Sequence, residues 1–477
     1  MKQIMLSTIL FLAVTIASAQ TTGDKQPANY KQQPANYKQL AAYQQPANYE
    51  AASWKIWHID NPQEITIAAP PGTGQSKIEL EAIKQGLKNL DESKLAIIKY
   101  WDAGAPAYRW NQIATTVIPW DNPDVLLRMP LAWMNLAVYD ATIIAWQEKL
   151  RHKRKRPATG DPSLKAVISG PSTFSYPCEH TVTAAAAAYV LAYFIPAKGD
   201  SILDLARAAS QSRVDAGVQY PSDIEAGWKL GEQVAKQIIA KAKNDGSTKK
   251  YTGPVNKDPK KWTGAYQMGI TLPLFEPLFL NSVDQFRPPP PPDFENEMKE
   301  MKNFKQTFRS RSLAYLWANL GPEFWTEIAS QKMFENRMGD DAPAVARIYA
   351  IMNSAFREVI VAVFDAKYAY WGIRPSQYDS TFKPLIQTPP FPGYPSGHAA
   401  GAGATAAVLE YFFPADAKQF HQLAQDCADS RFYAGIHFKV DNETALTMGK
   451  ALGKYVVETW MKNEISESGL RTVNRDK

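Results

Sequence analysis

The stretch Tyr394-Pro395-Ser396-Gly397-His398 leads directly into Ala399 to Phe413, a run rich in strong helix formers that stops at Pro414. The segments from Ala415 to Cys427 and from Asn442 to Met461 also carry apolar residues at helical spacing. Alternating patterns typical of strands are scarce along the rest of the chain. These patterns predict an all-α protein.

The same stretch occurs a second time, earlier in the chain, as Tyr176-Pro177-Cys178-Glu179-His180. The apolar run that follows it, Thr181 to Ile195, is shorter than the roughly 20 residues of a membrane span and predicts a buried core helix. Other residues recur at the separation of Tyr176 from Tyr394, which we call the repeat offset: Pro70 with Pro288, Lys149 with Lys367, Arg156 with Arg374, Pro196 with Pro414, Arg213 with Arg431, and Gly217 with Gly435. An offset kept over such a long stretch of chain indicates a duplicated unit. We expect two helical bundles related by a pseudo-twofold axis.

The segments before the bundles have a different character. Residues 1–19 have a charged start at Lys2, an apolar stretch and an Ala-Ser-Ala cleavage site, which predicts a secretory signal peptide and an exported, periplasmic or secreted protein. Residues 20–52 repeat Gln-Pro-Ala-Asn-Tyr from positions 26, 33 and 45, a polar pattern typical of a disordered linker. The proline run at 288–292 marks a boundary between an N-terminal bundle at 53–280 and a C-terminal bundle at 281–477.

Composition narrows the classes of partner. The chain has 477 residues, 45% of them hydrophobic and 21% charged, as in ordinary globular proteins. Its formal charge of +6 mildly suits an anionic substrate. Much of that charge lies in Arg151 to Arg156, which has no interleaved aromatic residues and indicates a solvated loop and no nucleic-acid partner. Cys178 and Cys427 could form a disulfide or remain two buried thiols.

Three cations near the C-terminus have the chemistry of an anion site. Arg374 and Arg431 offer planar forks of donors that match the geometry of an oxyanion, and Lys367 adds a point charge. Pro375 disfavours helix at the residue before it, so we expect Arg374 to lie where a helix ends. Each of these residues alone would be read as a surface charge or an ion pair. Together they predict a pocket for one tetrahedral anion.

The remaining donors come from two short motifs. Ser396 and Gly397 precede a helix, whose first amides attract anions; glycine permits close approach, and Ser396 is expected both to cap the helix and to donate a hydrogen bond. His437 follows Arg431 and offers a neutral imidazole that can attack phosphorus or bind a metal-oxyanion centre. His398 titrates near neutral pH and is a candidate acid-base residue. We read the other histidines as structural or surface residues.

The first copy has lost part of this set. It keeps Lys149, Arg156, His180 and Arg213. It has Cys178, Glu179 and Gln219 where the second copy has Ser396, Gly397 and His437. A glutamate in the anion loop would repel an oxyanion, and glutamine cannot act as the nucleophile or ligand. We therefore expect the N-terminal bundle to be a scaffold and the C-terminal bundle to carry the catalytic site.

The three motifs, Lys367-x6-Arg374-Pro375, Pro395-Ser396-Gly397-His398 and Ser430-Arg431-x5-His437, resemble the superfamily that joins vanadium-dependent haloperoxidases to type 2 phosphatidic-acid phosphatases and class A acid phosphatases. The resemblance implies that the site binds vanadate or phosphate. His437 would be the vanadate ligand or the phosphorylated nucleophile, and His398 the acid-base residue. The equatorial oxygens would be held by Lys367, Arg374, Ser396, Gly397 and Arg431.

Architecture favours the haloperoxidase branch of that superfamily. The lipid phosphatases cross the membrane several times and the class A phosphatases are single bundles, whereas this chain has two bundles and no further predicted span. The expected substrates are hydrogen peroxide and a halide. A phosphate ester, hydrolysed through a phosphohistidine, is the alternative, and a non-catalytic surface protein is a third possibility. The motifs predict neither the halide nor the oligomeric state.

The sequence departs from the family pattern at three places. Phe364 stands three residues before Lys367, where members often have tryptophan. The stretch from Trp317 to Asn319 lacks the carboxylate that steadies the second arginine in some members, although Asp102 is present in the first copy. Phe391 stands seven residues before His398, as in the chloroperoxidase-like branch, where bromide-type enzymes tend to have histidine. These differences bear on halide preference.

Overall fold

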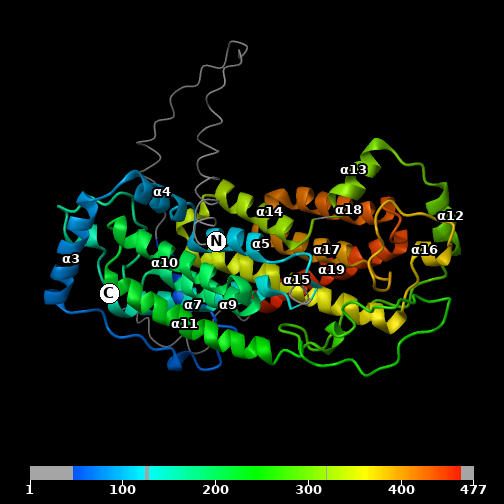
Figure 1. The fold of residues 1–477 in the computed structure, drawn as a ribbon, viewed down its shortest axis with the longest axis horizontal. Coiled ribbons are helices and arrows are strands. Elements are labelled where there is room, and N and C mark those ends of the chain that lie inside the picture. The colour runs from blue at the N-terminus through cyan, green and yellow to red at the C-terminus, as the bar shows by residue number, and fades with distance from the viewer. Residues whose placement is uncertain (1–46, 124–127, 319, 463–477) are drawn as a thin grey trace, which may run out of the picture. The chain divides into compact units, whose positions relative to one another are not determined.

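The fold is helical throughout the part of the chain that the computed structural model describes, residues 47–123, 128–318 and 320–462 (Figure 1). The regular elements in these ranges are α-helices and short 3-10 helices, so the predicted all-α class is confirmed. These residues belong to one compact unit. The predicted signal peptide and nearly all of the linker lie outside the described residues. The boundary near residue 281 between two bundles stays a prediction.

The first half of the described chain contains the N-terminal copy of the duplicated pattern. Its elements are η1 (Tyr49–Ser53), η2 (Pro62–Glu64), α3 (Thr73–Lys88), α4 (Glu92–Trp101), α5 (Pro106–Val117), α7 (Pro130–His152), α8 (Pro157–Gly160), α9 (Glu179–Phe194), η3 (Pro196–Lys198), α10 (Gly199–Asp215), α11 (Pro221–Lys243) and η4 (Leu272–Leu274). Helix α9 contains all but the last residue of the predicted core helix, Thr181 to Ile195, and most of its residues are buried.

The second half contains the three candidate motifs. Its elements are α12 (Glu295–Asn303), α13 (Phe308–Leu316), α14 (Pro322–Glu335), η5 (Met338–Asp340), α15 (Ala342–Tyr370), α16 (Pro375–Tyr378), α17 (Gly397–Phe412), η6 (Pro414–Asp416), α18 (Ala417–Tyr433) and α19 (Lys439–Lys462). Helices α17, α18 and α19 contain most of the three helical segments expected from the apolar spacing.

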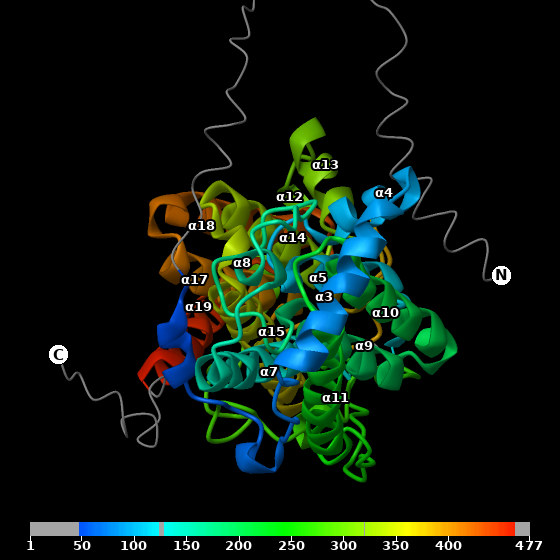
Figure 2. The same ribbon diagram turned by 90° about the vertical axis from the view of Figure 1, so that its left-hand side faces the viewer.

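Helix boundaries recur between the halves at the repeat offset. Helices α8, α9 and α10 begin and end at positions equivalent to those of α16, α17 and α18, and the end of α7 is equivalent to the end of α15. Helix α9 packs against α7, α10 and α11, as α17 packs against α15, α18 and α19. Helix α7 also contacts α15 directly, and Figure 2 shows α7, α9 and α11 close together at one end of the molecule. These observations support the duplication.

Close helix contacts within each half depend on glycine. A Cβ atom added at Gly449 in α19 would overlap the carbonyl group of Ala400 in α17. A Cβ atom at the equivalent Gly231 in α11 would overlap the carbonyl oxygen of Val182 in α9. Each glycine therefore lets its helix pack directly on the backbone of the neighbouring helix. This contact fixes the distance between α19 and α17 in one half and between α11 and α9 in the other.

Two further findings concern the environment of the chain. Among the described helices, none combines the length and hydrophobicity required to cross a bilayer. Cys178 and Cys427 are both buried and free, so the disulfide alternative is not realised.

Candidate functional site

The first motif spans the end of α15 and the start of α16. Lys367 lies in the last turn of α15, which ends at Tyr370 and is followed by Trp371 in the left-handed conformation with φ 53°. Arg374 precedes Pro375 with extended backbone angles, φ −92° and ψ 152°, and is the N-cap of α16. The expectation that Arg374 lies beyond a helix end is confirmed. Beyond this turn, Arg374 Nε donates to the Phe391 carbonyl oxygen at 3.1 Å, next to the carbonyl oxygens that Lys367 contacts.

Both cations are fully buried and only partly satisfied. Lys367 Nζ donates to the carbonyl oxygens of Pro392 at 2.7 Å and Gly393 at 2.8 Å. Arg374 Nη1 donates to the carbonyl oxygen of Ile436 at 2.6 Å, whereas Arg374 Nη2 has no protein partner. Burial, reinforced by the Arg374 charge, lowers the pKa of Lys367 well below its usual value, while Asp441 opposes the shift. A bound anion would relieve this electrostatic cost.

His437 is held between an arginine and a carboxylate. Its Nε2 atom lies 2.9 Å from Arg374 Nη1, and its Nδ1 atom lies 3.0 Å from Asp441 Oδ2. Because arginine can only donate, Nε2 accepts, and the ring proton is on Nδ1, directed to Asp441. Burial, together with the charge of Arg374, lowers the pKa of His437 well below its usual value. The ring is thus neutral, with its Nε2 lone pair directed at the cationic side of the site.

Asp441 is the residue that the sequence reasoning missed. It lies one helical turn after His437, at the start of α19, and its backbone oxygen also accepts the Ser396 amide at 3.0 Å. Its Oδ1 atom has no protein partner, and burial raises its pKa to about 7. The duplication contained a signal for it, since Asp223 stands at the equivalent position of the first copy.

The second motif lies at the N-terminus of α17. Ser396 is the N-cap residue, but its side chain makes no capping bond, so that expectation is wrong. Its hydroxyl is buried without a protein partner and thus remains available for a ligand. A Cβ atom added at Gly397 would meet no atom within 4 Å. The loop therefore leaves space beside residue 397, where a side chain would otherwise project.

His398 and Arg431 complete the predicted set. Arg431, in the last turn of α18, is buried; its Nε donates to Ser430 Oγ at 3.2 Å and its Nη2 to the Ala314 carbonyl oxygen at 3.4 Å. Burial, reinforced by the charges of Arg431, Lys367 and Arg374, lowers the pKa of His398 to about 3. The same three cations depress the pKa of His437. The two imidazoles and three cations therefore lie within electrostatic range of one another.

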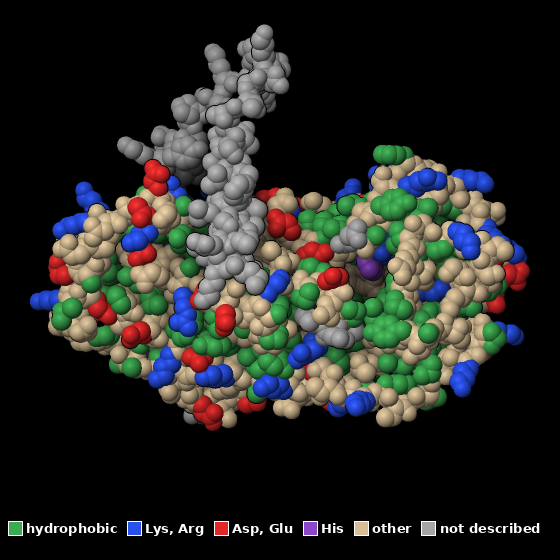
Figure 3. Space-filling view, in the orientation of Figure 1, with side chains coloured by type: hydrophobic (Ala, Val, Ile, Leu, Met, Phe, Trp, Pro, Cys, Tyr) green, Lys and Arg blue, Asp and Glu red, His purple; other side chains and the backbone are tan. Residues whose placement is uncertain are grey.

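The departures from the family pattern have visible consequences. Arg431 has no carboxylate partner in the part of the chain that the structure describes, although Arg213 Nη1 in the first half lies 2.9 Å from Asp102 Oδ1. Asn319 lies outside the described residues. The Phe391 ring centroid lies 5.1 Å from Lys367 Nζ and 5.1 Å from Arg374 Cζ, so this ring covers both cations. Figure 3 shows a histidine recessed below the surface, with acidic and hydrophobic side chains near it.

These donors fit a tetrahedral oxyanion. Arg374 Nη2 and Ser396 Oγ are buried donors without protein partners. Burying such groups is costly unless a ligand accepts their hydrogen bonds. Vanadate and phosphate carry the required negative oxygens, and the His437 Nε2 lone pair could bind the central atom in exchange for the hydrogen bond that it accepts from Arg374. Gly397 leaves room for such a group beside the cations.

Two family models match the sequence. The PAP2 superfamily model matches residues 129–244, and the model of the VCPO second helical-bundle domain matches residues 415–464. The PAP2 match therefore lies on the first copy, which lacks the complete motifs. No curated protein matches the sequence.

Solved structures of bacterial haloperoxidases superpose on most of the chain. A bacterial vanadium-dependent iodoperoxidase aligns with a TM-score of 0.59 at 22% identity, over 75% of this chain and 96% of its own. The chain has the haloperoxidase fold. A holo bacterial vanadium-dependent chloroperoxidase aligns with a TM-score of 0.55 at 17% identity, over 73% of this chain and 94% of its own. Both alignments cover about three quarters of the chain, so they include parts of both halves. A match to one helical bundle alone would cover only one half.

Proposed function

We propose that this chain is a vanadate-dependent haloperoxidase that oxidises a halide with hydrogen peroxide. The observation that carries the proposal is the orientation of His437, whose Nε2 lone pair faces Arg374 while Asp441 holds Nδ1. The haloperoxidase fold over both halves favours this activity over phosphate-ester hydrolysis. Export of the chain, inferred from residues 1–19, is part of the same proposal.

Each polar group of the site has a role in this proposal. His437 Nε2 would bind the vanadium once Arg374 Nη1 turns its hydrogen bond from Nε2 to an oxygen of the anion, and Lys367, Arg374, Ser396, Gly397 and Arg431 would hold the oxygens. When bound, vanadate supplies an electrophilic centre that activates peroxide for oxygen transfer to a halide. The cations stabilise negative charge that develops on the oxygens, and they do so without reorganisation because the protein already holds them in place.

His398 would move protons at this site. Burial, reinforced by the surrounding cations, lowers its pKa to about 3 and so favours the neutral imidazole in the ligand-free protein. A neutral imidazole can accept a proton from hydrogen peroxide as it binds. An oxyanion among the cations would partly cancel their field, which would bring the pKa of His398 back toward neutrality. His398 could then return the proton to the departing oxygen.

One purified sample tests the proposal in two parallel assays. The first adds orthovanadate, hydrogen peroxide and chloride, bromide or iodide to the apo protein and measures halogenation. The second measures hydrolysis of a phosphate ester without vanadate. We expect halogenation only with vanadate and its loss in His437→Ala, whereas His421→Ala, which removes a histidine paired with Glu410, should retain it. Failure with all three halides would refute the proposal, and ester hydrolysis with a phosphohistidine at His437 would establish the phosphatase alternative.

A further inference from the structure

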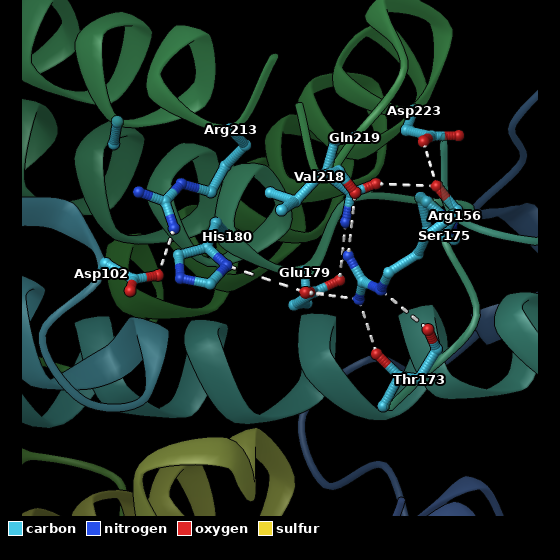
Figure 4. A network of polar contacts seen from close by, with 12 residues as sticks. Asp102, Arg156, Thr173, Ser175, Glu179, His180, Arg213, Val218, Gln219 and Asp223 are labelled. Carbon is cyan, nitrogen blue, oxygen red and sulfur yellow. Dashed lines mark hydrogen bonds and ion pairs between the residues drawn. The ribbon is translucent and has the colours of Figure 1, made fainter. Parts of the chain in front are cut away.

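The N-terminal half contains a polar cluster at the positions equivalent to the candidate site. Figure 4 shows Arg156, Glu179 and Gln219 directed toward one another beside His180. Lys149, in the last turn of α7, also reaches this cluster. These residues correspond, at the repeat offset, to Arg374, Gly397, His437, His398 and Lys367. The cluster therefore resembles the C-terminal site in its cations and histidine, and it contains a carboxylate that the C-terminal site lacks.

The Glu179 carboxylate occupies the centre of this cluster. Its Oε2 atom accepts hydrogen bonds from Lys149 Nζ at 2.8 Å and Gln219 Nε2 at 3.3 Å. Its Oε1 atom accepts a hydrogen bond from Arg156 Nη2 at 2.8 Å and lies 3.7 Å from His180 Nδ1. Only 4% of Glu179 is exposed. Although burial opposes ionisation, Arg156 and Lys149 hold the pKa of Glu179 well below its usual value, so the group is an anion.

One donor that Glu179 satisfies is left without a partner in the other half. Arg156 Nη2 bonds to Glu179, whereas the equivalent Arg374 Nη2 has no protein partner. Gly397 stands at the position equivalent to Glu179. A Cβ atom added there would have no neighbour within 4 Å, so the space that the Glu179 side chain fills in the first half is open in the second. A carboxylate presents two negative oxygens to the same donors that an oxyanion would use. The two halves thus differ in whether the anion is part of the chain.

We infer that the N-terminal half contains a second oxyanion-binding cradle and that the Glu179 carboxylate is its built-in ligand. The class of ligand that this cradle would take without the carboxylate is a small tetrahedral oxyanion such as phosphate or vanadate. Glu179 does not simply repel an external anion, as the sequence alone suggests; it replaces one. The PAP2 match to residues 129–244 contains every residue of this cluster and agrees with a shared origin of the two cradles.

The inference is tested by opening the cradle. Glu179→Gly reproduces the residue of the C-terminal loop and leaves Lys149 and Arg156 without their anion. Inorganic phosphate should then bind and stabilise the variant, because a ligand that binds only the folded state raises stability with its concentration. We expect one more bound phosphate per chain than in the wild type, measured by calorimetry, and a larger phosphate-dependent rise in Tm. Chloride at matched ionic strength separates binding from screening.

Glu179→Gln is the matched control, because its amide fills the same space and leaves no room for phosphate. It should gain no phosphate site. If Glu179→Gly folds only in phosphate, and not in matched chloride, the inference is supported. If it folds in neither buffer, or if its phosphate stoichiometry and Tm response equal those of the wild type, the inference is wrong. The proposed haloperoxidase activity is judged separately, since the extra site of the variant does not depend on what the C-terminal site of the wild type binds.

Discussion

His437 Nδ1 donates a hydrogen bond across 3.0 Å to Oδ2 of Asp441, four residues further along the chain in the first turn of α19, and both side chains are buried. Such a partner fixes the tautomer and orientation of an imidazole whose other nitrogen faces a ligand. The Asp441 main-chain oxygen also accepts the Ser396 amide, so one residue connects the second and third motifs.

Asp441→Asn should weaken vanadate binding while the chain stays folded. A carboxylate can only accept a hydrogen bond, whereas the asparagine amide can also donate, so the variant no longer fixes the proton of His437 on Nδ1. The loss of such a partner typically lowers the affinity for the metal by about 10- to 100-fold. Titration of peroxidase activity against orthovanadate measures it. Asp223→Asn is the control: Asp223 is equivalent to Asp441, but Gln219 stands in place of His437 in that half. This variant should leave the vanadate affinity unchanged. Equal effects of the two variants would contradict the role of Asp441.

Gly397→Glu should close the C-terminal site with a carboxylate from the chain itself. The new side chain enters open space beside Lys367 and Arg374 and should pair with them as Glu179 pairs with Lys149 and Arg156. Vanadate-dependent activity should fall by about 100-fold or more, since these donors no longer reach an external oxyanion. Thermal unfolding should show a Tm no lower than that of the wild type, because two buried cations gain an anion.

Gly397→Ala is the control for the loss of glycine. The methyl group occupies the same open space but carries no charge, so it should retain most of the activity. The prediction fails if Gly397→Glu retains wild-type vanadate affinity, or if Gly397→Ala is equally inactive.

His398→Ala should lower kcat with little effect on vanadate binding. His398 is placed to move protons, and removing a general acid-base residue typically costs about 10²- to 10⁴-fold in rate. Steady-state kinetics at several vanadate and peroxide concentrations separate rate from affinity. A change confined to the vanadate affinity would instead assign His398 to holding the oxyanion.

His58→Phe should make the protein less sensitive to acid. His58 is buried against the rings of Trp133 and Phe279, its Nε2 atom lacks a protein partner, and burial lowers its pKa to about 3. Because the unfolded chain binds a proton near pH 6.5 and the folded chain does not, wild-type stability is lost as the pH falls from 6.5 toward 3. At pH 5, about 1.5 units below the unfolded pKa of 6.5, this loss is about 2 kcal/mol, because each unit corresponds to about 1.4 kcal/mol.

Denaturant unfolding at pH 7.5 and pH 5 measures the effect. The difference in unfolding free energy between His58→Phe and the wild type should move in favour of the variant at the lower pH. The other buried histidines are common to both proteins, so their contributions cancel in that difference. The same difference at both pH values would show that His58 does not contribute to acid sensitivity.

The sequence alone determined the helical class and the residues that recur at the repeat offset, and it predicted which cations hold the anion. These follow from local rules: helix formers, proline stops and the residues at matched positions are read without knowing how the chain packs. The position of Arg374 beyond a helix end also followed locally, because a proline restricts the residue before it.

Only the tertiary structure decided what each polar atom contacts. It assigned the His437 proton through Asp441, left the Ser396 hydroxyl free when it was expected to cap α17, and placed Glu179 as a partner of Lys149 and Arg156 when repulsion of an anion was expected. The reason is that hydrogen bonds and desolvation depend on side chains that are distant in sequence and meet only when the helices pack. A carboxylate near two buried cations can repel an incoming anion or can take its place. Which of the two it does depends on where its oxygens lie, and only the folded structure sets that position.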